Sequence, residues 1–184
     1  MGRILAGRAR GRRLGSPPGL QTRPTSSRVK KSLFDILAPR LSGARFLDLC
    51  AGAGGVGLEA LSRGAAGVVL VDESSASCAL IRKNAEILGL PGAEVVCQDA
   101  RVALRGLARA GASFDVVFLD PPYESDVYEA LLELVPGVLS EDGVVIAEHF
   151  KKRPLAERIG PLERHRAVRI GDHTLTFMGV PRRE

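Results

Sequence analysis

Five short apolar runs alternate with longer segments of helical length, and this alternation limits the possible folds more than any other feature of the chain. The longer segments include Val56–Arg63, Ser74–Leu88 and Val127–Val135, in which apolar residues recur at helical spacing. Such alternation is typical of domains in which helices cover both faces of a mainly parallel sheet. The predicted fold is therefore a doubly wound α/β domain. Its expected strands are Arg45–Leu49, Gly67–Val71, Ala93–Cys97, Phe114–Leu119 and Val144–Glu148.

The two ends of the chain depart from this pattern. Glu163–Ile170 and His173–Val180 are joined by Gly171-Asp172, a pair typical of tight hairpins, so we expect antiparallel strands at one edge of the sheet. A second, smaller hairpin is expected within Arg3–Leu14.

We expect one catalytic domain rather than two, because 184 residues are enough for one well-buried core. A helix is predicted near residues 26–38 from its apolar spacing. The chain is therefore divided into a basic N-terminal extension with this helix, residues 1–38, and one domain, residues 39–184.

Positive charge is concentrated at the N-terminal end. The first 34 residues hold nine of the 26 basic residues and none of the 21 acidic ones, so the other 150 residues carry a net charge of −4. A cationic arm on an acidic domain favours a polyanionic partner, although a solvated tail would look the same. With six Phe, two Tyr and no Trp, no broad stacking platform for single strands is expected.

Cysteines and histidines give no metal-binding spacing. Cys50, Cys78 and Cys97 are widely separated, so we expect reduced thiols and no metal ion. Surface positions are expected for the histidines, His149, His165 and His173. No run approaches the roughly 18 apolar residues of a membrane span, which predicts a cytoplasmic protein without a membrane partner.

A glycine-rich loop follows the first expected strand and leads directly into a helix. Glycines let the backbone approach a ligand closely, and a helix N-terminus offers free N–H groups. Asp48 at the strand end suits a cationic group, such as the amino group of a methionine moiety. The glycines at positions 52, 54 and 57 also match the dinucleotide motif, so a nucleotide-dependent oxidoreductase is kept as an alternative.

The next two strands also end in acidic residues. Asp72, or Glu73 if the strand ends one residue later, can accept hydrogen bonds from both ribose hydroxyls of a cofactor. Asp99, followed by Ala100, is expected beside the adenine ring. N-capping of the following helix is the alternative for Asp99, and one carboxylate can serve both purposes.

The tetrapeptide Asp120-Pro121-Pro122-Tyr123 follows the fourth strand and indicates the chemistry. The Asp120 carboxylate and the Pro121 carbonyl can each accept one hydrogen of an exocyclic amine. The prolines fix these acceptors, and Tyr123 can stack on a base. Because this motif and the glycine loop line one crevice, the sequence predicts methyl transfer to an amino nitrogen. The base must be unpaired or flipped out.

Together these motifs resemble the class I methyltransferases that act on amino groups, and more closely the RsmD-type 16S rRNA guanine-N2 methyltransferases. The resemblance covers nearly the whole chain. It rests on Arg3–Leu14, Arg23–Arg28, Ser32–Leu37, Asp48–Leu61, Asp120–Tyr123 and Ala147–His149.

The resemblance implies a Rossmann-like fold, S-adenosylmethionine as methyl donor with S-adenosylhomocysteine as product, and one guanine of 16S rRNA as target. The partner would be free 16S rRNA or a small-subunit assembly particle, and we expect a monomer. The cofactor loop would consist of Ala51, Gly52, Ala53 and Gly54, together with Asp48. The expected RNA-binding residues are Arg8, Arg10, Arg12, Arg13, Arg23, Thr25 and Arg28.

Two further alternatives remain open. The same chemistry could act on adenine N6 or cytosine N4 in RNA or DNA, or on a protein glutamine, since the strand-four motif does not separate these targets. A non-catalytic rRNA-binding assembly factor would keep the basic arm but need not bind the cofactor.

Overall fold

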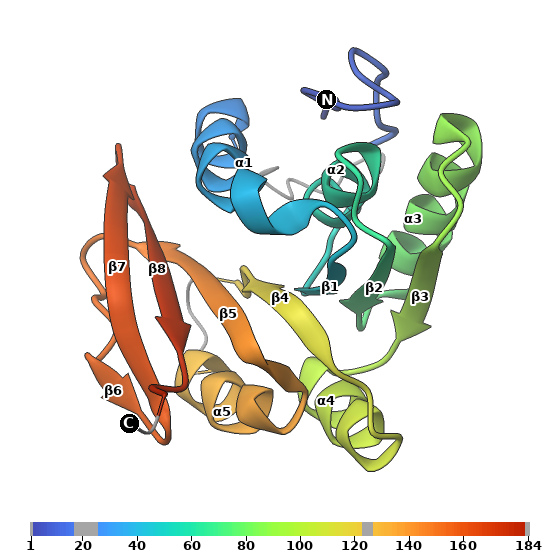
Figure 1. The fold of residues 1–184 in the computed structure, drawn as a ribbon. Helices are drawn as coiled ribbons and strands as arrows, with labels where there is room; N and C mark the ends of the chain where they lie inside the picture. The colour runs from blue at the N-terminus through green and yellow to red at the C-terminus, as the bar shows by residue number, and fades with distance from the viewer. Residues whose placement is uncertain (1, 17–25, 123–126, 183–184) are drawn as a thin grey trace.

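The alternating runs form one sheet flanked by helices in the computed structural model, which describes residues 2–16, 26–122 and 127–182 (Figure 1). The strands are β1 (Arg45–Leu49), β2 (Gly67–Asp72), β3 (Ala93–Cys97), β4 (Phe114–Leu119), β5 (Leu139–Phe150), β6 (Arg158–Ile159), β7 (Leu162–Ile170) and β8 (His173–Gly179). The helices are α1 (Ser27–Leu41), α2 (Gly57–Ser62), α3 (Ser75–Leu88), α4 (Ala100–Arg109) and α5 (Val127–Leu134), with a short 3-10 helix, η1 (Val135–Gly137).

The strand order is β3-β2-β1-β4-β5-β8-β7-β6. Strands β3, β2, β1, β4 and β5 pair in parallel, whereas β8, β7 and β6 pair antiparallel at one side. The chain moves outward from β1 through β2 to β3 and then returns to β4 on the other side of β1. The predicted doubly wound Rossmann-like sheet with an antiparallel C-terminal hairpin is therefore confirmed.

Element boundaries differ from the prediction mainly at β5. This strand begins at Leu139, which pairs with Phe114 ahead of a register shift, whereas the sequence indicated a start at Val144. The intervening residues include the exposed Glu141 and Asp142, so they carry no apolar pattern. A search for apolar runs in the sequence therefore misses strand residues whose side chains are exposed to solvent.

Helices cover both faces of the sheet. Helices α1, α2 and α3 lie on one face, and α4 and α5 lie on the other (Figure 1). Helix α1 begins after the N-cap Ser26, whose hydroxyl accepts a hydrogen bond from Val29 N–H, and it buries Leu33, Phe34 and Leu37. The sheet therefore separates two apolar clusters, one under each helical layer. None of the helices formed by the described residues is long and apolar enough to cross a membrane.

The N-terminal arginine-rich segment forms the small hairpin that the sequence predicted. Arg3 and Arg13 make an antiparallel bridge, and Ile4 N–H donates to Arg12 C=O at 3.0 Å. The hairpin packs on α2, because Ala9 N–H donates to the Ser62 hydroxyl at 2.9 Å. The hairpin is therefore a folded part of the molecule, and the division of the chain at residue 38 stays a prediction.

Glu59 of α2 holds this hairpin through a fully buried carboxylate. Its two oxygens accept hydrogen bonds from Leu5 N–H at 2.7 Å and Ala6 N–H at 2.9 Å. The same carboxylate lies 3.1 Å from Lys30 Nζ and 2.8 Å from Arg63 Nε. Burial lowers the pKa of Lys30, while the charge of Glu59 opposes that shift. One side chain therefore joins the hairpin, α1 and α2.

We expect Glu59→Gln to lower the free energy of unfolding by about 3–5 kcal/mol, because it leaves the buried Lys30 ammonium without its counter-charge. Urea denaturation at pH 7 measures this. Glu86→Gln, on the exposed face of α3, is the matched control and should change the unfolding free energy little. Equal stability of the two variants would contradict the role given to Glu59.

Candidate active site

The strand order reverses between β1 and β4, and ligands of doubly wound sheets bind outside the carboxyl ends of the strands at that position. Three acidic residues lie at this edge, on three adjacent strands: Asp48 on β1, Asp120 directly after β4, and Glu148 on β5. Asp48 pairs with Phe118, two residues before Asp120, and Leu119 pairs with Ala147, one residue before Glu148. The three carboxyl groups therefore lie near one another.

Asp48 is buried and holds the start of α2. Its carboxylate accepts a hydrogen bond from Gly57 N–H at 2.8 Å. Burial raises the pKa of Asp48 to about 7, with smaller contributions from the charges of Asp120 and Asp72, while the Gly57 hydrogen bond opposes the shift. A side chain at Gly57 would place its Cβ 2.7 Å from Leu70 Cδ2, so this glycine allows close packing of α2 on β2.

The loop between β1 and α2 turns sharply. Cys50 has a φ of 62°, and Gly52 and Gly54 also have positive φ. Asp72, at the end of β2, fixes this loop, because its carboxylate accepts hydrogen bonds from Gly52 N–H at 2.8 Å and from Ser74 N–H at 2.9 Å. Asp72 therefore positions the predicted cofactor loop, and its predicted contact with a ribose stays a prediction.

A buried side chain that the sequence interpretation did not identify supports the same loop. Asn84 of α3 donates a hydrogen bond to Ala53 C=O at 3.0 Å and accepts one from Gly15 N–H at 2.8 Å. A second support comes from β2, because Ala51 N–H donates to Val71 C=O at 2.9 Å. Asn84 lies three residues after the buried Ile81, so an asparagine on the apolar face of a helix was the signal in the sequence.

Asp99 acts as the N-cap of α4, as the alternative interpretation allowed. Its carboxylate accepts hydrogen bonds from Arg101 N–H at 2.9 Å and Val102 N–H at 3.2 Å. The Arg101 side chain lowers the pKa of Asp99. Ala100 is the first residue of α4, and Glu73 is exposed just after β2. Contacts of these residues with a cofactor stay predictions.

Asp120 follows β4 and is half-buried, and desolvation raises its pKa to about 7. Pro121 is buried and Pro122 is exposed. The Pro121 carbonyl oxygen lies 3.5 Å from the hydroxyl of Tyr128 on α5, a contact that sequence patterns did not indicate. Tyr123, which was predicted to stack on the base, lies outside the described residues.

Glu148 lies beside Asp120 and has a fully buried carboxyl group. Burial raises the pKa of Glu148 to about 8, and the charge of Asp120 adds to this shift. Its Oε1 is 2.7 Å from Nδ1 of His173. The Tyr128 hydroxyl donates to the backbone carbonyl of Glu148 at 2.6 Å and so connects α5 to the end of β5.

The expected surface position of His149 is wrong. His149 is buried on β5, where its Nε2 lies 2.8 Å from the Thr176 hydroxyl of the neighbouring strand β8. A long polar side chain at the end of a strand can be buried when the adjacent strand supplies a hydrogen-bonding partner. His165 is exposed, as expected. Among the described residues, no group of three His, Cys, Asp or Glu side chains could hold a metal ion.

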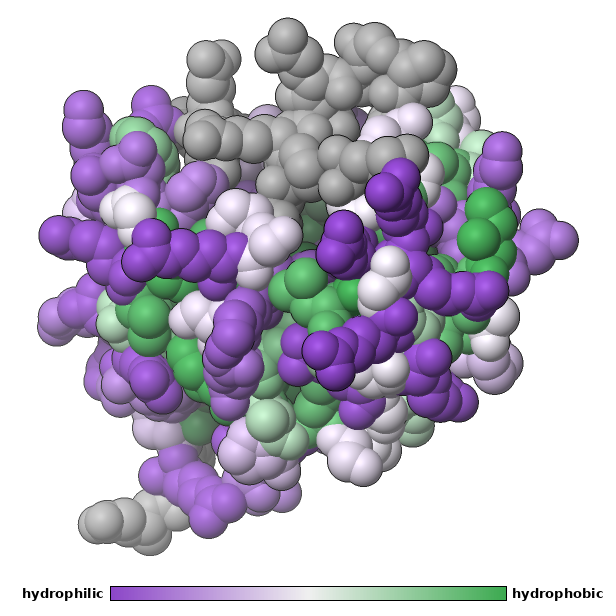
Figure 2. Space-filling view, turned by 90° about the horizontal axis from the view of Figure 1, so that it is seen from above, coloured by the Kyte–Doolittle hydropathy of each residue, from purple (hydrophilic) through white to green (hydrophobic). Residues whose placement is uncertain are grey.

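The described arginines predicted to bind RNA are all exposed. The N-terminal hairpin carries Arg8, Arg10, Arg12 and Arg13, and Arg28 lies in the first turn of α1. Arg12 donates to Leu88 C=O at 3.0 Å. Figure 2 views the molecule from the side of this hairpin and shows a largely hydrophilic face with scattered hydrophobic areas. Arg23 and Thr25 lie outside the described residues.

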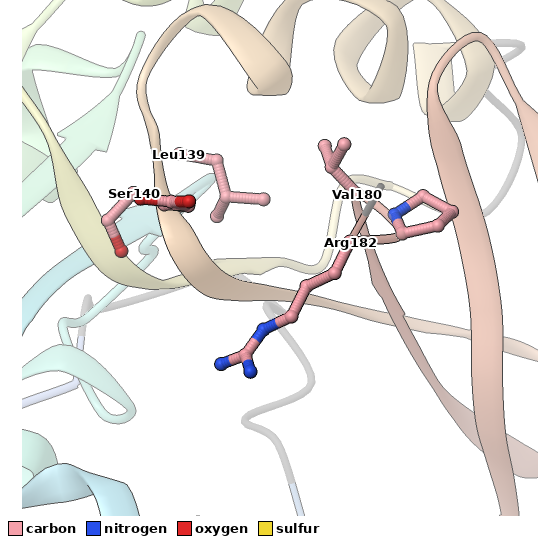
Figure 3. A pocket seen from close by; sticks show the side chains of 6 residues that line it. Leu139, Ser140, Val180 and Arg182 are labelled. Carbon is pink, nitrogen blue, oxygen red and sulfur yellow. The ribbon is translucent and has the colours of Figure 1, made fainter. Parts of the chain in front are cut away.

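A separate pocket of about 430 Å³ lies at the opposite edge of the sheet (Figure 3). Its lining includes Leu139, Ser140, Val180 and Arg182. Leu139 pairs with Phe114 at the beginning of β4, whereas Asp120 follows the end of that strand. Six residues of extended strand span roughly 20 Å, so this pocket is not part of the crevice formed by the three acids.

The raised pKa of Asp48 predicts that the ligand-free protein loses stability as pH rises. The folded state binds more protons than the unfolded state between the ordinary pKa of 3.8 and the folded value of about 7. The unfolding free energy therefore falls through this window. Asp120 and Glu148 act in the same direction.

We expect Asp48→Asn to reduce this fall, because the amide does not titrate while its oxygen can still accept from Gly57 N–H. Urea denaturation at several pH values between 5 and 8 measures the effect. Asp35→Asn, at an exposed position of α1, should leave the pH dependence unchanged. Parallel pH curves for the wild type and Asp48→Asn would show that Asp48 does not titrate in this range.

Comparison with known proteins places this geometry in a family. The family model described as conserved hypothetical protein 95 matches residues 2–179. YlbH of Bacillus subtilis is 40% identical over 163 residues, which cover 87% of this chain and 89% of that protein. Ribosomal RNA small subunit methyltransferase D of Escherichia coli K12 is 38% identical over 148 residues, covering 79% of this chain and 73% of that protein.

A solved structure of a hypothetical protein from Thermus thermophilus has a TM-score of 0.84 and 35% sequence identity. The match covers 96% of this chain and 98% of that chain, so the N-terminal hairpin and the C-terminal strands belong to the shared fold. The chain therefore belongs to the family described as conserved hypothetical protein 95, the RsmD-type family of S-adenosylmethionine-dependent methyltransferases.

Proposed function

We propose that this protein transfers the methyl group of S-adenosylmethionine to the exocyclic N2 of a guanine in 16S rRNA. One observation carries the proposal: Asp120 and the carbonyl of Pro121 lie at the carboxyl edge of the sheet, beside the glycine loop that follows Asp48. A pair of oxygen acceptors next to a cofactor loop fits an amino group as the methyl acceptor.

The residues of the crevice fit a cationic cofactor. Three carboxyl groups with raised pKa values are gathered there, and a positively charged ligand would favour their ionised forms. The loop from Ala51 to Gly54 is held by Asp72 and Asn84, so its backbone is arranged before any ligand binds. When bound, S-adenosylmethionine supplies an activated methyl group on its sulfonium sulfur.

Asp120 and Pro121 have defined tasks in this proposal. The lone pair of an exocyclic amine is delocalised into the base, so the amine must be held with that lone pair facing the methyl carbon. The Asp120 carboxylate and the Pro121 carbonyl each accept one amine hydrogen and so favour a more tetrahedral nitrogen. Tyr128 contacts both Pro121 and the end of β5 and limits movement of these acceptors.

The choice of guanine in 16S rRNA rests on the family. The Escherichia coli relative is named as a methyltransferase of small-subunit rRNA, and the match covers most of both chains. The exposed arginines of the hairpin supply contacts to phosphate groups that do not depend on sequence. Adenine N6, cytosine N4 and protein glutamine would fit the same two acceptors, so product analysis must separate them.

We expect the wild type to form N2-methylguanosine in 16S rRNA or in small-subunit particles from cells that lack this protein. Transfer of labelled methyl groups followed by nucleoside analysis measures this. Asp120→Ala should lower kcat by about 10²–10³-fold, because it removes one of the two oxygen acceptors that hold the amine. The affinity for S-adenosylmethionine should change less than threefold.

Asp142→Ala, at an exposed position near the start of β5, is the matched control and should keep full activity. Labelled methyl groups in another nucleoside would support the same reaction on a different base. Failure to transfer methyl groups, despite cofactor binding, would point to a protein substrate. Failure to bind the cofactor would support the non-catalytic assembly factor.

The hairpin arginines should make the RNA affinity strongly salt-dependent. We expect the variant Arg10→Ala with Arg13→Ala to lower the slope of log Kd against log salt by about 0.7–0.9 for each arginine that contacts a phosphate. Fluorescence anisotropy with a 16S rRNA fragment measures this. The matched control is Arg105→Ala with Arg109→Ala, on exposed positions of α4 at the opposite face. An equal slope for both double variants would exclude the hairpin as an RNA contact.

A further inference from the structure

Glu148 is a buried acid to which the methyl transfer described above gives no task. Its side chain is 1% exposed, and neither carboxyl oxygen makes a hydrogen bond of normal geometry within the part of the chain that the structure describes. A buried carboxyl group without such partners costs stability. It is therefore poorly explained as a structural group, and groups of this kind gather at functional sites.

The sheet places Glu148 directly beside Asp120. Leu119 of β4 pairs with Ala147 of β5, so the next residue on each strand is again opposite the other. Paired residues of parallel strands point to the same face of a sheet, and neighbouring strands lie about 4.8 Å apart. The charge of Asp120 also contributes to the raised pKa of Glu148, which requires that the two groups be close.

His173 connects Glu148 to the surface. Glu148 pairs with Leu175 of β8 and Phe150 pairs with His173, so His173 is the diagonal neighbour of Glu148 on the same face. His173 Nδ1 lies 2.7 Å from Glu148 Oε1. The His173 side chain is 13% exposed to solvent, whereas that of Glu148 is 1% exposed. Asp120, Glu148 and His173 therefore form a row from the methylation site to solvent.

We propose that Glu148 and His173 carry away the proton that leaves the methylated nitrogen, an inference that rests on the function proposed above. The base nitrogen forms its bond to the methyl carbon while the bond between that carbon and sulfur breaks, and sulfur keeps the electron pair. The N–H bond breaks as this new bond forms, its electron pair returns to nitrogen, and Asp120 takes the proton, so the rate of methyl transfer reports the proton step as well.

From Asp120 the proton passes to Glu148, then to Nδ1 of His173, while Nε2 of the imidazole releases a proton to solvent. No hydrogen bond between Asp120 and Glu148 is formed within the described residues, so one water molecule between them completes the path. The groups that face Glu148 are Asp120, directly after β4, and His173 of β8. The Tyr128 hydroxyl of α5 donates to the backbone carbonyl of Glu148. After release, Asp120 is again a carboxylate.

The test is single-turnover methyl transfer to RNA over pH 5.5 to 9 with Glu148→Gln, Glu148→Asp and His173→Asn. We expect Glu148→Gln to lower the rate at pH 7 by at least about tenfold, in line with the contribution of positioned proton acceptors. His173→Asn should lower it less, since water can replace a group that is in contact with solvent. The apparent affinities for S-adenosylmethionine and RNA should change less than twofold. Glu148→Asp should recover part of the rate because it keeps a carboxyl group.

The pH profile separates proton transfer from a structural role. The wild-type rate should rise with pH as the acids ionise, and the profile should lose its inflection near pH 8 in Glu148→Gln. Glu141→Gln and His165→Asn, at exposed positions, should keep the wild-type profile. Glu148→Gln removes a buried titrating group, so we expect it to fold at least as stably as the wild type above pH 7.

Three results would overturn the proposal in distinguishable ways. A wild-type rate and pH profile in Glu148→Gln would show that Asp120 loses its proton by another route, while the proposed function stands. Absence of methyl transfer by the wild type itself, in the presence of bound cofactor, would overturn the proposed function together with this inference. Loss of rate in Glu148→Gln with an unchanged pH profile would assign Glu148 a structural role only.

Discussion

The hydrogen bond from Gly57 N–H to the buried carboxylate of Asp48 fixes the geometry on which the crevice depends. It joins the end of β1 to the start of α2, so the connecting loop must make its full turn within a few residues. Gly57 permits the contact because it has no side chain to collide with Leu70. Asp72 and Asn84 then hold the loop from two further directions. The binding surface is thus built largely from backbone groups positioned by buried polar side chains.

Burial gives the three acids of the crevice their chemical character. Each stands near the end of a different strand; Asp48 and Glu148 are buried, and Asp120 is half-buried. Desolvation disfavours the charged form of an acid, and nearby acids add to the effect. Ionised acids in such surroundings lower the stability of the protein when the crevice is empty. A bound cation would offset this loss. The same low-polarity surroundings strengthen any hydrogen bond that Asp120 makes to a base.

The sequence was sufficient to predict the sheet, because its core strands are apolar runs and its turns contain glycine. It also predicted that Asp48 and Asp120 lie at the ends of neighbouring strands, since the ends of parallel strands meet at one edge, whereas their roles in binding and catalysis stay predictions. It did not reveal Asn84, Tyr128 or the buried position of His149, because each depends on a partner distant in the sequence. Asp72 illustrates the same limit, because its carboxylate accepts a hydrogen bond from Gly52 N–H, 20 residues earlier in the chain. N-capping by Asp99, a local interaction, was one of its two expected roles.

The docking of the N-terminal hairpin on α2 has a consequence for synthesis of the chain. The hairpin leaves the ribosome before its partners Glu59, Ser62 and Asn84, which follow some 50 to 70 residues later. Long-range contacts of this kind form late, because the intervening chain must first be ordered. During that interval the arginines belong to a mobile nascent segment and are exposed to the polyanionic surface of the ribosome itself. Completion of α3 ends this interval, since only then can the carboxylate, hydroxyl and amide partners all bind the hairpin.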